Sequence, residues 1–342
     1  MTGASPTVLV RVARAWVAAC ALAALALAAC FHVSRLATWW VELLRYLPFP
    51  IYLAPALVAV VVSWALPWGW RVVSIATVAL VLTGVMGFEW HRGEHGDVRM
   101  RVMTFNAKAH QGAGVEVFAR IAAEIAAQDP DVLVMQDSTL AGETAMPAPL
   151  RAVLGSYQLH LSGQYVVASR YPLRDCRDVP MRAGADDSRY VRCELFAHGH
   201  AMTLVTAHLA SPRQGLNAAR REGLEGLDDW NTNLEHRLTQ AGTIVRDLSG
   251  APRPLILAGD LNAPEHSPVV QALLRLGLRD AFGAAGAGYG YTHGHSLRPG
   301  FSFLRIDHIL VSPQIGVADC YAGGSAASEH RPVIADLLLR RQ

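Results

Sequence analysis

The stretch of sequence that decides the fold reads Leu255-Ile256-Leu257-Ala258-Gly259-Asp260-Leu261-Asn262 and is followed by Ala263-Pro264. Its apolar run is typical of a buried strand, which a proline cannot extend. Asp260 and Asn262 therefore lie at the carboxyl end of a strand, where side chains two residues apart share one face. A carboxylate that can take a proton from water, beside an amide that can hold an oxyanion, suits hydrolysis of a phosphate ester. A strand followed by an ordinary Asx turn explains this stretch equally well when it is taken alone.

Polar side chains stand at the ends of apolar runs elsewhere in the sequence as well. They include Asn106, Gln136-Asp137, His208, Asp307-His308 and Glu329-His330, in that order. Hard carboxylate and amide oxygens suit Mg²⁺ or Mn²⁺ as ligands, and two histidines remain for proton transfer. This repetition favours a catalytic interpretation over a series of unrelated turns.

Seven short motifs carry a resemblance to a known family. They are Phe105-Asn106, Val134-Met135-Gln136-Asp137, Ser169-Arg170-Tyr171-Pro172, Thr206-Ala207-His208-Leu209, Gly259-Asp260-Leu261-Asn262, Arg305-Ile306-Asp307-His308 and Ser328-Glu329-His330. In these motifs and their order, residues 99–342 resemble the endonuclease/exonuclease/phosphatase superfamily of DNase I-like nucleases, inositol-phosphate phosphatases and sphingomyelinases. The resemblance implies an α/β fold, a four-layer sandwich of two mixed β-sheets flanked by helices, with the site at one end between the sheets. A bacterial membrane-attached subgroup is similar in having apolar helices before this domain.

The resemblance also implies catalytic roles for five residues. Asp260 is expected to orient or deprotonate the attacking water, and Asn262 to stabilise the phosphorane oxygens. His330 is expected to contact the scissile phosphate, with Asp307 bonded to its other ring nitrogen, because imidazoles usually need an orienting partner. His208 is the candidate general acid for the leaving oxygen.

By the same resemblance, Asp137 is the expected metal-binding acid, with Asn106 beside the metal and Glu329 as a further ligand. Residues expected to contact the substrate are Arg170, Thr292 and Arg305. The family normally has Glu at the position of Asp137 and Asp at the position of Glu329, so both carboxylates are displaced by one methylene. Metal ligands tolerate little displacement, so these departures predict an altered metal affinity or choice, and they leave open an inactive family member. His293 is expected to be a loop histidine that could line the pocket.

Residues 1–92 form a predicted membrane region, and residues 97–342 the catalytic domain. Three apolar segments, Ala15–Val33, Leu47–Leu66 and Val72–Phe88, are each near the ~20 residues that cross a bilayer, and two spans are the alternative. Tryptophans at their edges are typical of membrane interfaces: Trp39, Trp40, Trp68 and Trp70. We expect a multi-pass protein of the bacterial inner membrane. Arg11 and Arg14 before the first span favour a catalytic domain outside the cytoplasm, although the loop arginines as a whole are balanced.

The net charge of the predicted catalytic domain argues against binding of long nucleic acid. Of 30 basic and 28 acidic residues, five Arg and two Glu lie in the first 90 residues, which leaves the rest with a net charge of −1. The only lysine is Lys108. Four arginines cluster after His208: Arg213, Arg220, Arg221 and Arg237. A local basic patch is one interpretation, and a solvated helical face is the one we favour. A helix is expected over about 217–249, with a break near 223–229.

The domain holds three cysteines, Cys176, Cys193 and Cys320, so at most one disulfide can form there. Ordinary buried thiols are the default expectation for all three.

Three functions therefore compete. The first is a membrane-anchored, metal-dependent phosphoesterase acting on a lipid headgroup or another small phosphorylated molecule. The second is a nuclease of the same fold, acting on DNA or RNA near the membrane. The third is an inactive domain that binds a ligand or a membrane partner. The expected partners are a phosphate ester and the lipid bilayer, with nucleic acid as the alternative and no protein partner specified.

Overall fold

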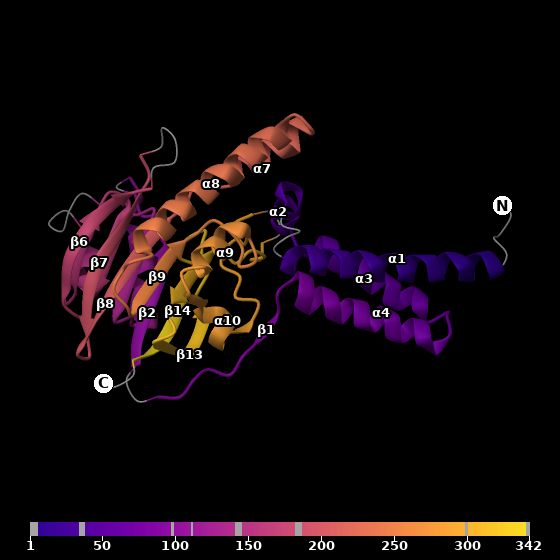
Figure 1. The fold of residues 1–342 in the computed structure, drawn as a ribbon, viewed down its shortest axis with the longest axis horizontal. Coiled ribbons are helices and arrows are strands. Elements are labelled where there is room, and N and C mark those ends of the chain that lie inside the picture. The colour runs from indigo at the N-terminus through magenta and orange to yellow at the C-terminus, as the bar shows by residue number, and fades with distance from the viewer. Residues whose placement is uncertain are drawn as a thin grey trace. The chain divides into compact units, whose positions relative to one another are not determined.

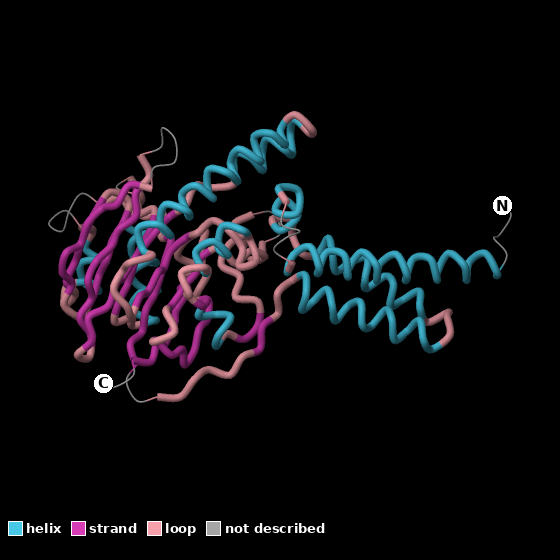
Figure 2. The backbone as a smooth tube through the Cα atoms, viewed as in Figure 1, coloured by secondary structure: helices cyan, strands magenta, loops and turns pink. Residues whose placement is uncertain are grey.

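The computed structural model of the chain describes residues 6–33, 38–96, 99–110, 112–140, 146–181, 187–297 and 300–339. Internal contacts divide the chain into two compact units, Met1–Glu89 and Trp90–Gln342. Figure 2 shows that the first unit is helical, whereas the second contains most of the strands.

The first unit is a set of apolar helices. They are α1 (Pro6–His32), α2 (Trp39–Arg45), α3 (Pro50–Ser63) and α4 (Trp68–Leu80), which continues into the π-helix η2 (Val81–Val85). Two helical segments, Thr7–His32 and Trp68–Val85, are long and apolar enough to cross a membrane. The middle span expected over Leu47–Leu66 exists only if α2 and α3, which are bent by 76° relative to each other, count as one span.

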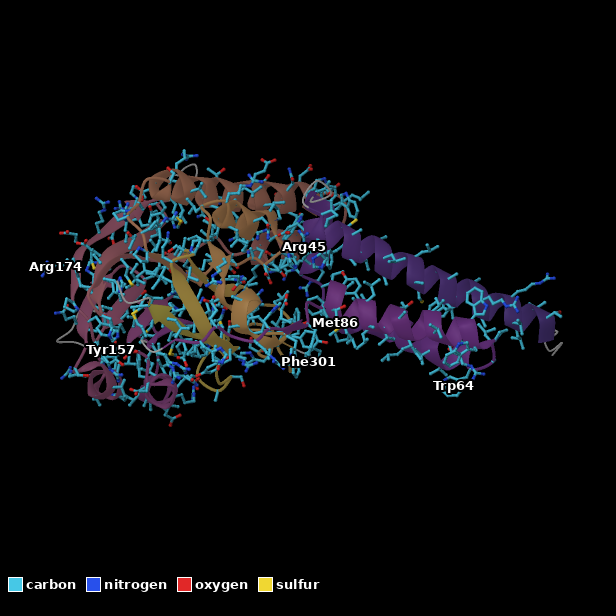
Figure 3. All side chains as sticks on the ribbon, turned by 60° about the horizontal axis from the view of Figure 1, so that its bottom comes forward. Arg45, Trp64, Met86, Tyr157, Arg174 and Phe301 are labelled. Carbon is cyan, nitrogen blue, oxygen red and sulfur yellow. A yellow bond between two sulfur atoms is a disulfide. The ribbon has the colours of Figure 1, made fainter. Side chains whose placement is uncertain are left out.

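The helices of this unit expose apolar side chains. Leu22 of α1 is 67% exposed, and Trp64, labelled in Figure 3, is 68% exposed at the end of α3. Apolar surface of this kind suits an apolar surrounding. Inside the unit, the buried Arg45 pairs with Glu42 at 2.9 Å and donates to the carbonyl of Phe31 at 2.7 Å. Its guanidinium therefore satisfies carbonyl groups at the end of α1, where a cation is favoured.

The second unit contains two six-stranded sheets. One has the order β13-β14-β2-β3-β5-β4 and the other β10-β12-β9-β8-β7-β6. The bounds of the first sheet are β2 (Arg99–Asn106), β3 (Val132–Gln136), β4 (Gln158–Ser162), β5 (Tyr165–Ser169), β13 (Ile315–Ala322) and β14 (Val333–Leu339). Those of the second are β6 (Leu173–Pro180), β7 (Arg189–Ala197), β8 (His200–His208), β9 (Leu255–Asp260), β10 (Arg279–Asp280) and β12 (Asp307–Val311). Two short strands, β1 (Glu89–Trp90) and β11 (Ala287–Gly288), complete the set. Both large sheets are mixed, because β2–β3 and β8–β9 are parallel and the other pairs antiparallel.

Helices accompany the two sheets, and most of them cover the outer faces. The helices are α5 (Val115–Gln128), α6 (Ala148–Leu154), α7 (Arg213–Glu222), α8 (Gly226–Leu248), α9 (Pro268–Leu274) and α10 (Ala281–Ala285). α5 and α6 pack on the first sheet, and α8 and α9 pack on the second, along which α8 is seen in Figure 1. The inner faces of the two sheets form a shared apolar core. The predicted α/β sandwich of two mixed sheets flanked by helices is confirmed.

The expected long helix over 217–249 is two helices. α7 ends at Glu222, Gly223 has φ +62°, and α8 begins at Gly226. A Cβ on Gly226 would lie 2.2 Å from the backbone of Ala218, so only glycine allows this close approach. The break therefore lies where it was predicted, and the first helix begins earlier, at Arg213.

The expectation that all domain cysteines are free thiols is wrong. Cys176 of β6 and Cys193 of β7 form a disulfide across neighbouring strands, and Cys320 is a buried free thiol. Spacing along the chain could not select this pair, because a register shift between Arg174 and Arg177 brings the two sulfurs together.

Strand alternation carries the polar strand ends into the space between the sheets. In β9, Ile256 and Ala258 face the shared core, so Asp260 continues the same face. The same alternation places the last residues of β2 and β8, Asn106 and His208, on the inner faces. Gly259 is required here, because a Cβ would lie 1.9 Å from the carbonyl oxygen of Ala207 in the neighbouring strand.

Candidate active site

Asp260 lies at the centre of the polar cluster and is fully buried. Its Oδ2 accepts a hydrogen bond from Asn106 Nδ2 at 2.8 Å, and its Oδ1 accepts one from the backbone N–H of Asn262 at 2.9 Å. His208 Nε2 and His330 Nδ1 lie 3.5 and 3.8 Å from Oδ2. Burial opposes ionisation, but the two imidazoles and these donors outweigh it and lower the pKa of Asp260. The side chain is therefore a carboxylate at neutral pH.

His330 is held by two carboxylates. Its Nδ1 donates to Asp307 Oδ2 at 2.9 Å, and Asp307 is paired in register with Asp260 across β12 and β9. Burial opposes the charged ring, but Asp307 and then Asp260 raise the pKa of His330 to about 9. The ring is therefore an imidazolium at neutral pH, and its Nε2 has no hydrogen-bond partner among the described residues.

His208 is oriented by a residue that the sequence did not single out. Gln164, in the turn between β4 and β5, lies with its Oε1 2.6 Å from His208 Nδ1. The backbone N–H of His208 also donates to the hydroxyl of Tyr165 at 3.0 Å. These contacts leave Nε2 directed towards Asp260. Gln164 lies outside the seven motifs that carry the resemblance, so no local signal pointed to it.

Asn262 stands in the turn after β9 with a positive φ of 48°. Its Nδ2 donates to the carbonyl of Leu209 at 2.9 Å, and its own carbonyl accepts from Arg237 Nη1 at 3.1 Å. Arg237 is fully buried and lies over the ring of Trp230, so the expectation that it is solvated is wrong. Helix α8 turns this arginine inward, where it supports the turn that carries Asn262.

A second carboxylate group lies beside the first. Lys108 Nζ lies 3.7 Å from Asp137 Oδ2 and 3.3 Å from Glu329 Oε2. Arg213 approaches Glu329 at 3.6 Å, and His110 approaches Asp137 at 3.4 Å. Burial would raise the pKa of Glu329, but Lys108 and then Arg213 lower it. Both acids therefore lie in a cationic surrounding.

The comparisons with known proteins agree with this geometry. The model of the Endonuclease/Exonuclease/phosphatase family matches residues 103–330, two thirds of the chain. The chain belongs to this family.

Several solved structures have the same fold. An endonuclease/exonuclease/phosphatase from Beutenbergia cavernae is 22% identical, with a TM-score of 0.50 over 70% of this chain and 72% of its own. Truncated Caenorhabditis elegans TDP2 is 17% identical, with a TM-score of 0.53 over 70% of this chain and 98% of its own. The mannosyl-6-phosphatase of Bacteroides thetaiotaomicron is 18% identical, with a TM-score of 0.51 over 70% of this chain and 100% of its own. No curated protein matches the sequence. Family membership supports a hydrolase of phosphate esters.

A divalent metal, which the family implies, suits the second carboxylate group. Asn106 Oδ1 is buried and has no hydrogen-bond partner among the described residues, since only Nδ2 of this amide is bonded. An amide oxygen and the carboxylates of Asp137 and Glu329 are hard donors of the kind that Mg²⁺ or Mn²⁺ prefers. Ligand atoms of Asp260, Asp307 and His330 also lie within 4.8 Å of one another.

Of the three residues expected to contact substrate, Arg170 lies at the far end of a sheet, and Thr292 and Arg305 lie in the interior beneath the site. Arg170 follows β5 and pairs with Asp129 and Asp131, which precede β3. The site lies beyond the other end of β3, about 16 Å away at ~3.3 Å per residue. Because β5 runs antiparallel to β3, Arg170 at the end of β5 lies at the opposite end of the sheet from the site.

Thr292 and Arg305 are interior supports. The Thr292 hydroxyl is fully buried and accepts the backbone N–H groups of Ile306 and Asp307 at 3.2 and 3.4 Å. Arg305 is 8% exposed and is held by ion pairs with Asp280 and Glu265. Both residues stabilise the strand that delivers Asp307, and neither side chain is open to a substrate.

His293 does reach the site. Its ring lies 4.6 Å from that of His330, centroid to centroid, and its Nδ1 lies 3.2 Å from the carbonyl of Glu329. Burial and the neighbouring His330 lower the pKa of His293, so this ring is neutral beside a charged one. His293, which was expected to be a loop histidine that could line the pocket, therefore lies beside the site.

Proposed function

We propose that the chain is a membrane-anchored phosphoesterase that hydrolyses a phosphodiester, or phosphomonoester, of a lipid headgroup or small molecule. The observation that carries the proposal is the convergence of Asn106, His208 and His330 on one buried carboxylate, Asp260. Such a cluster can orient water, bind a phosphate oxygen and deliver a proton within one site.

Each residue then has a task in an in-line displacement at phosphorus. Asp260, ionised at neutral pH, orients the attacking water and takes its proton as the bond to phosphorus forms. The His330 imidazolium, fixed by Asp307, donates from Nε2 to a phosphate oxygen. His208, fixed by Gln164, protonates the leaving oxygen, and Asn262 stabilises the charge that develops on the phosphorane.

Asn106, Asp137 and Glu329 would hold the divalent metal, Mg²⁺ or Mn²⁺. When bound, the metal neutralises charge on the phosphate, which is the main electrostatic task in phosphoryl chemistry. Asp137 stands where the family normally has Glu, and Glu329 where it normally has Asp. Both keep the negative charge, while the length of each side chain changes by one methylene.

Membrane attachment and an extracytoplasmic catalytic domain form the second part of the proposal. Two apolar helices are long enough to span a bilayer, and the domain carries the disulfide Cys176–Cys193. Disulfides persist in oxidising compartments such as the bacterial periplasm. Labelling cells with a bulky maleimide before and after reduction tests this part. Two cysteines that react only after reduction are expected, and reaction of Cys176 and Cys193 without reduction would exclude it.

A nuclease is the second candidate. Danio rerio TDP2 in complex with single-strand DNA product has the same fold, with a TM-score of 0.52 and 16% identity over 70% of this chain and 99% of its own. The exposed Arg220 and Arg221 at the end of α7 offer positive charge for a nucleic acid. The net charge of −1 outside the first 90 residues weighs against this candidate.

The test is hydrolysis by the full chain in lipid nanodiscs with Mg²⁺ or Mn²⁺. Substrates are phospholipids, bis-p-nitrophenyl phosphate, plasmid DNA and RNA. Asp260→Asn is expected to lose at least ~10³-fold in turnover, because the neutral amide cannot orient or deprotonate water. Asp247→Asn, which changes a distant acid bound to Tyr190 and Arg192, is the matched control and keeps activity. Full turnover by folded Asp260→Asn would refute the assignment, and the preferred substrate separates lipid enzyme from nuclease.

A further inference from the structure

Lys108, the only lysine of the chain, lies between the two carboxylates of the expected metal site. It follows β2 by two residues, and Asp137 follows the neighbouring parallel strand β3 by one. Both residues have left-handed backbones, with φ of 48° and 50°. This conformation is unfavourable for side chains with a Cβ, so the surrounding structure holds both residues in place.

We propose that Lys108 is an internal cation that competes with a divalent metal for Asp137 and Glu329 and thereby sets the metal affinity of the site. Oxygen ligands of Mg²⁺ or Mn²⁺ must approach to about 2.0–2.2 Å, and an ammonium among them repels the entering ion. The metal therefore binds only when the ammonium leaves the two carboxylates. Lys108 is 28% exposed, so its flexible side chain has a route outward.

The other nearby basic side chains cannot play this part. Among the described residues, Arg213 contacts only Glu329 and is 62% exposed, while His110 contacts only Asp137 and is 54% exposed. Lys108 alone bridges both acids. When its charge is removed, His110 and Arg213 still face one carboxylate each, so the two acids keep a partner and the site stays assembled.

The inference rests on the metal site of the proposed function, and it is tested without substrate. Mn²⁺ binding to the full chain in nanodiscs is measured by electron paramagnetic resonance, as free Mn²⁺ against total Mn²⁺. Lys108→Met is expected to bind Mn²⁺ at least about tenfold more tightly than the unchanged chain, in the range typical of residues that adjoin a metal site. Lys108→Arg keeps the positive charge, so this variant is expected to bind Mn²⁺ as weakly as the unchanged chain.

Two controls make the result decisive. Arg213→Met removes a cation that touches only one acid and is expected to change affinity by less than about threefold. Adding Asp137→Asn to Lys108→Met should abolish the gain, and Lys108→Gln replaces Lys108→Met if the latter loses its thermal transition. Equal or weaker Mn²⁺ binding in the folded neutral variants overturns the inference, as does a gain that survives Asp137→Asn. Failure of the proposed function is distinguishable, because it shows as undiminished turnover in Asp260→Asn.

Discussion

Replacing Asp307 with asparagine should destabilise the catalytic unit at the pH values where His330 is charged. The effect should be small where His330 is neutral. The Asp307 carboxylate lies 2.9 Å from His330 Nδ1, whereas that of Asp260 lies 3.8 Å away. The pKa of His330 is raised from 6.5 to about 9. At about 1.4 kcal/mol per pKa unit, this rise corresponds to about 3 kcal/mol of stability, of which we assign about 2 kcal/mol to the nearer Asp307.

The sign follows from the direction of the shift. A raised pKa stabilises the folded state fully below pH 6.5, and the contribution disappears as pH rises through about 9. Asp307→Asn should therefore lower the melting temperature by roughly 4–8 °C at pH 6, at about 2–4 °C per kcal/mol, and by far less at pH 10.

The assay is thermal unfolding of the full chain between pH 6 and 10, with Asp336→Asn as the matched control. Asp336 pairs with Arg101 at 2.7 Å, and arginine keeps its proton throughout this range. Asp336→Asn should therefore lower the melting temperature by the same amount at every pH. A loss in Asp307→Asn that is equally constant with pH would refute the claim that Asp307 keeps His330 charged.

Three further results are expected. Gln164→Ala should lower kcat about tenfold with little change in KM, because His208 loses the contact that orients its ring; an unchanged kcat would make Gln164 incidental. Arg237→Met should destabilise the unit by about 1–3 kcal/mol, because the carbonyl of Asn262 loses a buried donor, and an unshifted thermal transition would contradict this. Chelation should abolish hydrolysis and added Mg²⁺ or Mn²⁺ should restore it, whereas activity that ignores the chelator would remove the metal from the mechanism.

A polar layer between the apolar core and the site shows how far local sequence rules reach. Thr104, Gln136 and Thr206 lie on the inner faces of three strands, and Gln136 Nε2 donates to both hydroxyls, at 3.1 and 2.9 Å. Alternation along each strand predicts which face these side chains occupy. It does not predict that a strand of one sheet meets a strand of the other here, because that depends on how the two sheets pack.

The sequence by itself determined the elements and the inner-facing ends of the strands. Asp260, His208 and Asn106 each end a buried strand in which every second residue faces the core between the sheets, and this period of two is a property of the strand alone. The family motifs added the sandwich and the expected roles. These local signals were sufficient to name Asp260, His208 and His330, which the structure brings together.

Only the tertiary structure decided which polar residues are supports and which face the site. Arg237 and Arg305 are buried beneath it, and Arg170 lies at the far end of the sheet. Gln164 and Lys108 reach it from a turn and from a strand end. The reason is physical: strand order, register and helix packing bring together residues far apart in the chain, such as Lys108 and Glu329, and no local pattern encodes those pairings.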